Sequence, residues 1–119
     1  MQTKDILSMA VQAADDKKAE NITALDMRGI SLIADYFIIC HANSEKQVQA
    51  IARGVKEVAL ENELEVKRME GFDDARWVLL DLNDVVIHIF HRDERSYYNL
   101  EKLWGDASTI QLDKMLTSP

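Results

Sequence analysis

The strongest constraint on the fold is a pair of short apolar runs that flank Asn83-Asp84. Residues 77–82 and 85–90 are rich in β-branched and aromatic side chains. A two-residue loop of Asn/Asp type between two such runs predicts a tight β-hairpin. The turn also sets the register, because residues equally far from it face each other. The predicted pairs are Leu82 with Val85, Asp81 with Val86, Leu80 with Ile87, Leu79 with His88, Val78 with Ile89 and Trp77 with Phe90.

This register divides the hairpin side chains between two unlike faces, since successive residues of a strand alternate in direction. One face is wholly aliphatic and is expected in the core: Val78, Leu80, Leu82, Val85, Ile87 and Ile89. The other, called here the hairpin face, is apolar with two ionisable groups: Trp77, Leu79, Asp81, Val86, His88 and Phe90. Such a face is either covered by a helix that satisfies those groups or kept for a partner, and the sequence leaves both possibilities open.

Apolar side chains at helical spacing predict two amphipathic helices. The first covers residues 3–19, with Thr3 as a plausible cap. The second covers residues 44–63, and Ser44 with Gln47 three positions later matches a capping box at its start. Both helices therefore have a side that needs an apolar surface to pack on.

Three further segments predict strands. Residues 22–28 alternate in polarity, residues 35–41 form a short apolar run typical of a central strand, and the charged residues 64–70 suit a sheet edge. After Phe90 the chain predicts a helical turn and a short helix that Gly105 ends. A helix between strands favours parallel pairing and the hairpin is antiparallel, so the sequence predicts a mixed α/β sheet of about five strands with packed helices.

Composition limits the possible partners. The chain has 119 residues, 47% of them hydrophobic, which fits one domain with a real core. We expect that domain to span residues 1–107, followed by a less informative tail over 108–119. The formal net charge of −7 argues against binding nucleic acid by phosphate neutralisation. The basic residues Lys67 and Arg68, or Arg92 and Arg95, are too sparse for such a patch, whereas an acidic protein can dock on a basic protein.

The single cysteine and the N-terminal segment bear on the compartment. Cys40 has no second cysteine for an intrachain disulfide, so a reducing compartment is the simple interpretation. The first ten residues include Lys4 and Asp5 without a long apolar region, so no secretory signal is visible, and no apolar run is long enough to span a bilayer. We expect no membrane association.

No residue pattern predicts a catalytic or metal site. His88 and His91 lie three apart at the end of a strand, so their side chains should point to opposite faces and no third ligand follows. His88 and Asp81 are diagonal neighbours, but a structural or interface hydrogen bond is favoured over acid–base catalysis because no nucleophile stands nearby. The isolated glycines form no phosphate-binding loop, and no paired aspartates suit nucleotidyl transfer. We expect no cofactor.

The segment after the hairpin is aromatic and allows two interpretations. Tyr97, Tyr98, Leu100, Leu103 and Trp104 lie at helical spacing. Leu100, Leu103 and Trp104 could fasten the helix to the core, or some of Tyr98, Leu100 and Trp104 could anchor a protein partner, where aromatic side chains are the usual hot spots.

The chain resembles the ribosomal silencing factor family, also called the Iojap family. The stretches that carry the resemblance are ALDMRGIS (24–31), ADYFIICHANSEKQVQAIA (34–52) and EGFDDARWVLLDLNDVVIHIFHRDERSYYNLEKLWGDA (70–107). The long run that begins at Trp77 and ends at Trp104 is the most specific part. The resemblance covers about residues 3–107.

The resemblance implies a nucleotidyltransferase-like fold without the transferase site, and a function in translation. Such a factor would bind the large ribosomal subunit through ribosomal protein L14, block joining of the small subunit and repress translation when nutrients are short, in a bacterial cytoplasm. It implies a partner-binding role for a set of residues in the matching motif: Trp77, Leu79, Asp81, His88, Arg95, Tyr98, Leu100, Glu101, Lys102, Leu103 and Trp104.

Two other functions remain open at this stage. The chain could be a nucleotide-binding remnant or enzyme of the nucleotidyltransferase fold, which a metal-dependent effect of nucleotides on thermal stability would reveal. It could also be a homodimeric module that pairs through the hairpin face when it is off the ribosome, which light scattering over a concentration series would reveal.

Overall fold

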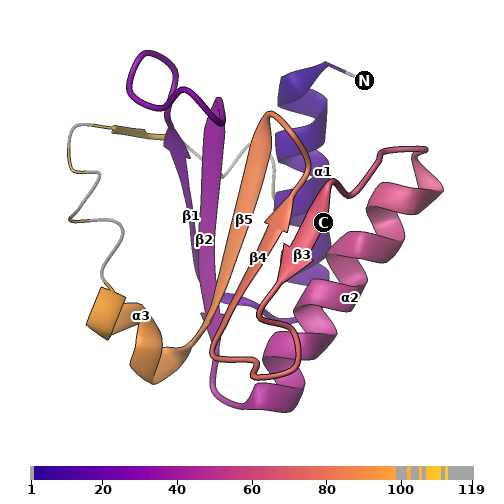
Figure 1. Ribbon diagram of the computed structural model, residues 1–119, viewed down its shortest axis with the longest axis vertical. Coiled ribbons are helices and arrows are strands. Elements are labelled where there is room, and N and C mark those ends of the chain that lie inside the picture. Colours follow the sequence, from indigo (N-terminus) through magenta and orange to yellow (C-terminus); the bar gives the residue numbers. More distant parts are fainter. Residues whose placement is uncertain (1, 99–101, 103–104, 106, 111, 113–119) are drawn as a thin grey trace.

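The computed structural model describes residues 2–98, 102, 105, 107–110 and 112, and over these residues helices pack against a β-sheet (Figure 1). In chain order they are α1 (Thr3–Asp16), β1 (Glu20–Asp26), β2 (Tyr36–Ala42), α2 (Glu45–Glu61), β3 (Arg68–Glu70), β4 (Trp77–Asp81), β5 (Val85–His91), α3 (Arg92–Tyr98) and β6 (Ser108–Thr109).

The strands form one mixed sheet in the order β3-β4-β5-β2-β1-β6. β2 and β5 pair in parallel at its centre, and the other neighbours pair antiparallel. The predicted mixed α/β sheet is confirmed, with six strands instead of about five. The additional strand is β6, which pairs with β1. The proposed boundary after residue 107 stays a prediction, although Ser108–Thr109 already belongs to the sheet.

The predicted hairpin is confirmed residue by residue. β4 pairs with β5 in the predicted register, from Trp77 opposite Phe90 to Asp81 opposite Val86. The backbone N–H of Leu82 donates to the carbonyl of Val85 at 2.9 Å, and Asn83 adopts φ +81 in the turn. This left-handed conformation suits asparagine, whose short side chain tolerates it.

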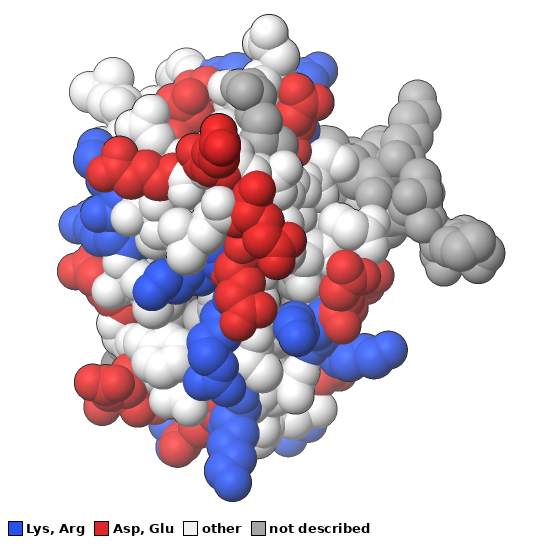
Figure 2. All heavy atoms as spheres, turned by 90° about the vertical axis from the view of Figure 1, so that its right-hand side faces the viewer, with Lys and Arg blue, Asp and Glu red and all other residues white. Residues whose placement is uncertain are grey.

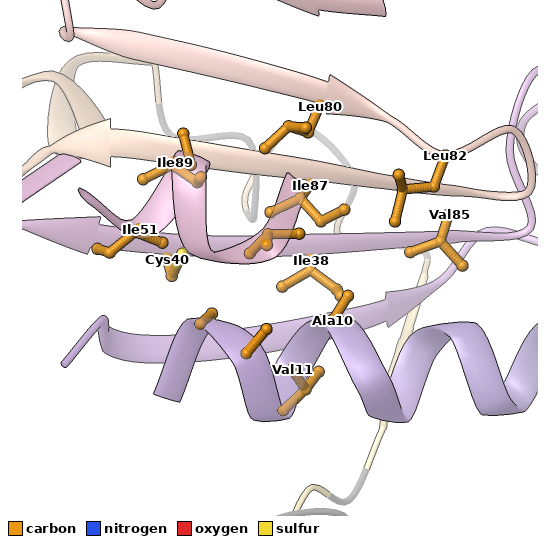
Figure 3. Packing of buried hydrophobic residues seen from close by; sticks show 14 of the residues in the cluster. Ala10, Val11, Ile38, Cys40, Ile51, Leu80, Leu82, Val85, Ile87 and Ile89 are labelled. Atoms are coloured by element: carbon orange, nitrogen blue, oxygen red, sulfur yellow. The ribbon is translucent and has the colours of Figure 1, made fainter. Parts of the chain in front are cut away.

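The aliphatic face of the hairpin lies in the main core, as predicted. All six of its side chains are buried there, with at most 3% of their surface exposed. Figure 3 shows five of them, Leu80, Leu82, Val85, Ile87 and Ile89, on the side of the sheet that faces residues of α1 and α2 such as Val11 and Ile51. Both helices cover the same face of the sheet (Figure 1), so this layer satisfies the apolar sides that the sequence predicted. Within the described residues, none of the helices combines the length and apolar character that crossing a bilayer requires.

The helix boundaries differ slightly from the prediction. The N-cap of α1 is Gln2 and not Thr3: the N–H of Gln2 donates to the Asp5 carboxylate at 3.1 Å, and the Thr3 hydroxyl donates to Asp84 at 3.4 Å. Ser44 caps α2 as predicted, because its hydroxyl accepts from the N–H of Gln47 at 3.1 Å. The Gln47 side chain instead donates to the carbonyl of Lys17, which links the two helices.

Two strands also differ from the predicted ranges. β1 begins at Glu20, two residues early, and its register with β2 shifts between Glu20 and Thr23, where Asn21 has φ +48. A bulge of this kind adds a residue that sequence alternation does not reveal. The predicted edge strand over 64–70 shortens to β3, and it does lie at the edge of the sheet.

The first prediction concerns the core. Leu80 and Ile87 are fully buried, so Leu80→Ala or Ile87→Ala should lower the free energy of unfolding by about 2–5 kcal/mol. Leu60 lies on α2 with 56% of its surface exposed and is the matched control, so Leu60→Ala should change it by less than about 0.5 kcal/mol. Urea denaturation measures all three, and equal losses for Leu80 and Leu60 would contradict the assigned core.

A second prediction compares two glycines with similar backbones. Gly29 has φ +82 and Gly71 has φ +79, so alanine at either position is strained by about 1 kcal/mol or more. A Cβ at Gly29 would meet no atom within 4 Å, whereas at Gly71 it would collide with the backbone carbonyl of Trp77. Gly71→Ala should therefore destabilise more than Gly29→Ala in thermal denaturation, and the reverse order would show that the start of β4 can shift freely.

Candidate interaction surface

The two strands of the hairpin contribute unequally to the hairpin face. Trp77, Leu79 and Asp81 of β4 are partly exposed. Val86, His88 and Phe90 of β5 are buried. β5 lies between β4 and β2, whereas the far side of β4 is flanked by the three-residue strand β3, so β4 has less cover. Neither of the two expected alternatives holds for the whole face, because half of it is core and half is accessible.

The buried half belongs to a second, smaller core on the side opposite α1 and α2. Its members come from β1, β2, β5 and the loop between β1 and β2: Leu25, Met27, Ala34, Phe37, Ile39, Val86 and Phe90. Trp77 and Leu79 pack against this cluster while remaining partly exposed. The accessible apolar residues of β4 are therefore fixed on a rigid base.

Trp77 and His88 form a hydrogen bond at the centre of the hairpin face. The indole Nε1–H of Trp77 donates to Nδ1 of His88 at 3.1 Å. The Trp77 ring also stacks on Phe90 with 5.1 Å between centroids, and Phe37 meets the His88 ring edge-on at 4.7 Å. Trp77 lies directly opposite Phe90, and both Trp77 and Phe37 are diagonal neighbours of His88, so the register brings these rings within reach of one another.

His88 is held as a neutral ring. It is 5% exposed, and burial lowers its pKa from 6.5 to about 4, because the buried environment penalises the charged form. Its Nε2 is buried and has no hydrogen-bond partner among the described residues. A buried polar atom of this kind is uncommon in folded proteins.

Asp81 is occupied by neighbours other than His88. Its Oδ1 accepts from the N–H of Asn83 at 2.8 Å, which supports the turn, and its Oδ2 lies 3.4 Å from Nε of Arg68. His88 takes its hydrogen bond from Trp77 instead. The two diagonal residues therefore form neither an acid–base pair nor the hydrogen bond that the sequence favoured, because each is bound to other groups.

A cavity of about 680 Å³ opens beside the hairpin face. Leu79, Asp81 and His88 line one part of it, and the loop between β1 and β2 lines another through Leu32 and Ile33. Leu32 is fully exposed and Ile33 is 72% exposed. This loop was not predicted as part of the surface, although the apolar residues between Gly29 and Asp35, in a segment without strand or helix periodicity, were a usable signal. Lys67 and Arg68, which are too sparse for a nucleic-acid patch, are exposed and also line the cavity.

Arg95 makes its hydrogen bonds within the protein. Its guanidinium donates to the carbonyl of Asn21 at 2.7 Å and to the Thr23 hydroxyl at 3.3 Å, and it lies 3.0 Å from Nδ1 of His41. These contacts attach α3 to the bulge of β1. Its predicted role at the rim of an interface stays a prediction.

The other predicted partner-binding residues lie at or beyond the end of α3. Tyr98 is the last residue of that helix. Lys102 is exposed. Leu100, Glu101, Leu103 and Trp104 lie outside the described residues. The binding role assigned to this set stays a prediction.

Titratable side chains outside the hairpin face have surroundings that do not indicate a catalytic or metal site among the described residues. Burial raises the pKa of the Cys40 thiol to about 12, so it stays protonated. His91 is less buried than His88 and lies 3.8 Å from the Asp93 carboxylate. Within the described part of the chain, no group of three or more His, Cys, Asp or Glu residues is arranged to hold a metal ion.

A third prediction follows from the buried histidine. The pKa of His88 is about 4 when folded and 6.5 when unfolded. Its stabilising effect is thus fully present above pH 6.5 and is lost as the pH falls toward 4, because the unfolded chain binds the proton more readily. Between pH 7 and pH 5 this residue should remove about 2 kcal/mol of unfolding free energy.

His88→Phe keeps a ring but cannot titrate, so its stability should fall by correspondingly less over the same interval. Urea denaturation at both pH values compares the two proteins, and all other titratable groups cancel in the difference. Equal losses would mean that His88 takes up its proton while the protein is folded.

Comparison with known proteins agrees with this fold. The chain matches, over residues 1–119, the family described as "Ribosomal silencing factor during starvation". It is 69% identical over 113 residues to the ribosomal silencing factor RsfS of Bacillus subtilis, covering 95% of this chain and 96% of the relative. The chloroplastic protein Iojap of Zea mays is 35% identical over 113 residues, covering 91% of this chain and 48% of that protein.

A crystal structure of a Bacillus halodurans protein superposes with a TM-score of 0.84 at 61% identity, covering 92% of this chain and 100% of that one. The family match along the whole chain and the high identity to the Bacillus subtilis relative agree with the resemblance in the hairpin motif. The chain is therefore a member of the RsfS/Iojap family of ribosomal silencing factors, whose role is to regulate translation.

Proposed function

We propose that this protein binds the large ribosomal subunit through ribosomal protein L14 and blocks joining of the small subunit. By occupying that surface it would repress translation under nutrient limitation, in the cytoplasm and without any catalytic step. The observation that carries the proposal is the accessible half of the hairpin face, in a family named for ribosome silencing.

The two sides of the molecule differ in the polarity of their exposed side chains, and this difference supports the proposed docking surface. The outer side of the helical layer presents charged side chains of both signs over much of its surface (Figure 2). The hairpin face instead offers Trp77 and Leu79, and the neighbouring loop offers Leu32 and Ile33. Apolar and aromatic side chains on a rigid base are typical of the centre of a protein interface.

Net charge favours a basic protein as the partner. The chain carries 21 acidic and 14 basic residues, and complementary charge increases the rate of encounter with a positively charged protein. The same charge repels ribosomal RNA phosphates, so it would limit binding elsewhere on the ribosome. A protein partner within a large RNA assembly is consistent with both effects.

Blocking of subunit joining needs occupancy alone. The principal-axis extents of the molecule are 33 × 31 × 31 Å. A copy bound to the large subunit would therefore keep the surface of the small subunit many ångströms away from the docking site. Steric exclusion then follows if the docking site lies on the side of the large subunit that faces the small one. The described residues that line the cavity act in this scheme as contacts.

The fourth prediction tests the surface with two exposed leucines. Leu32 is fully exposed beside the hairpin face, and Leu60 is 56% exposed on α2. Leu32→Ser should weaken association with isolated large subunits by about tenfold or more, since an apolar contact at an interface centre is lost. Leu60→Ser should bind as the unaltered protein does. Both changes lie on the surface, so both variants should keep the fold.

Co-sedimentation with purified large subunits measures the binding, and small subunits are then added to follow the formation of whole ribosomes. The unaltered protein should reduce whole ribosomes, and Leu32→Ser should reduce them less. Equal binding by Leu32→Ser and Leu60→Ser would move the interface away from this loop. Undiminished formation of whole ribosomes with the protein bound would disprove the blocking step.

A second copy of the chain is the competing occupant of the same surface. Leu32, Ile33 and Leu79 would also suit self-association, because an isologous dimer needs one apolar patch on each copy. Light scattering over a concentration series distinguishes the two cases. A dimer that large subunits do not dissociate would exclude the proposed docking through this face.

A further inference from the structure

We infer that the cavity beside the hairpin face receives a backbone carbonyl of an extended protein segment, with the Nε2–H of His88 as its hydrogen-bond donor. The inference rests on the proposed function, because it states what the same surface recognises in its protein partner. It assigns a recognition role to a residue whose burial would otherwise suggest a purely structural one.

The hydrogen bond from Trp77 determines which nitrogen of His88 carries the proton. An indole nitrogen can donate and cannot accept, so Nδ1 of His88 must be the acceptor in the 3.1 Å contact. A neutral imidazole has one N–H, which therefore lies on Nε2. Trp77 thus acts as a positioning residue that turns the unpartnered nitrogen of His88 into a donor.

The ring cannot rotate to satisfy this donor within the protein. Phe37 meets it edge-on at 4.7 Å, Phe90 lies parallel at 6.5 Å between centroids, and the Trp77 bond fixes the remaining edge. An unpaired buried donor raises the free energy of the folded state. A partner that supplies an acceptor removes this cost, so the new hydrogen bond should contribute more binding free energy than one formed at a solvent-exposed donor. His88 also lines the cavity, and because its Nε2 is itself buried, the groups that cover this nitrogen must move aside as the acceptor enters.

The charges around the cavity favour a neutral acceptor. Asp35, Asp81 and Asp84 line it together with Lys67 and Arg68. Arg68 lies 3.4 Å from Asp81, so part of the positive charge is already balanced. A phosphate or carboxylate would meet three carboxylates against two cations, one of them already close to Asp81, whereas a peptide carbonyl carries no net charge.

The apolar part of the cavity favours a peptide as the carrier of that carbonyl. Leu32, Ile33, Leu79 and Val86 all line it; Leu32 and Ile33 are exposed, whereas Val86 is buried. A carbonyl flanked by apolar side chains satisfies both kinds of surface, as in the extended segments that dock on β-sheets. An RNA segment would offer phosphates and ribose, which match neither the charges nor the apolar border.

The test uses the unaltered protein labelled with ¹⁵N at its histidines. In two-bond ¹H–¹⁵N spectra the free protein should show His88 protonated at Nε2. Purified ribosomal protein L14 is then added to saturation, and the Nε2–H resonance should move downfield as the hydrogen bond forms. A free protein protonated at Nδ1, or an Nε2–H that does not move in the saturated complex, would overturn the inference.

Two variants test the donor role of His88 through the affinity for L14. His88→Gln can place an amide N–H near the position of Nε2, whereas His88→Leu keeps a similar volume without a donor. His88→Leu should bind L14 about tenfold or more weakly, and His88→Gln should lie within about threefold of the unaltered protein. Isothermal calorimetry gives both affinities, and circular dichroism verifies the fold. If folded His88→Leu binds as tightly as His88→Gln, the donor has no role.

These outcomes separate the two proposals. If the unaltered protein binds neither L14 nor large subunits, the proposed function fails. If it binds both while His88 shows no response, the further inference alone fails. A short ribosomal RNA duplex serves as the third probe, and a downfield shift of Nε2–H on adding it in place of L14 would assign the cavity to RNA and overturn the peptide assignment.

Discussion

The parallel pairing of β2 with β5 is the constraint on which the rest of this structure depends. Both strands are buried along almost their whole length, and parallel strands at the centre of a sheet need cover on both faces. α1 and α2 cover one face with a large aliphatic core. The other face is closed by a smaller cluster from neighbouring strands and the loop after β1. That second closure is incomplete over β4, and the candidate interaction surface occurs at this place.

The incomplete closure explains why a polar pair sits among aromatic rings. His88 belongs to a strand that must be buried, so it cannot reach water, and Trp77 of the next strand satisfies one of its nitrogens. Trp77 is only partly covered, since its strand is adjacent to the short edge strand β3. One hydrogen bond therefore connects the core of the protein to its accessible surface. Contacts that a partner makes with Trp77 or in the adjoining cavity can therefore affect His88, which is otherwise shielded from solvent.

Features set by residues close together in the chain were predictable from the sequence, and features set by distant residues were not. The register of the β4–β5 hairpin and the Ser44 cap were predictable, because each depends on residues within a few positions of one another. The family resemblance was likewise carried by a continuous motif, and the comparisons confirm it. The bulge in β1, the contact of Thr3 with Asp84 and the sixth strand were missed. Each depends on residues far apart in the chain.

The features of the candidate site also separate into those set by nearby residues and those set by distant ones. The sequence by itself determined which residues share the hairpin face, because alternation along two paired strands needs no knowledge of the remaining fold. Only the tertiary structure decided that His88 is buried while Leu79 is partly exposed, since burial depends on the neighbours that β2, β3 and the loop with Leu32 supply. It also decided that Arg95 bonds to the bulge of β1, more than seventy residues away along the chain. The free energy of each side chain depends on its solvent exposure and its partners, and those were fixed when distant segments packed together.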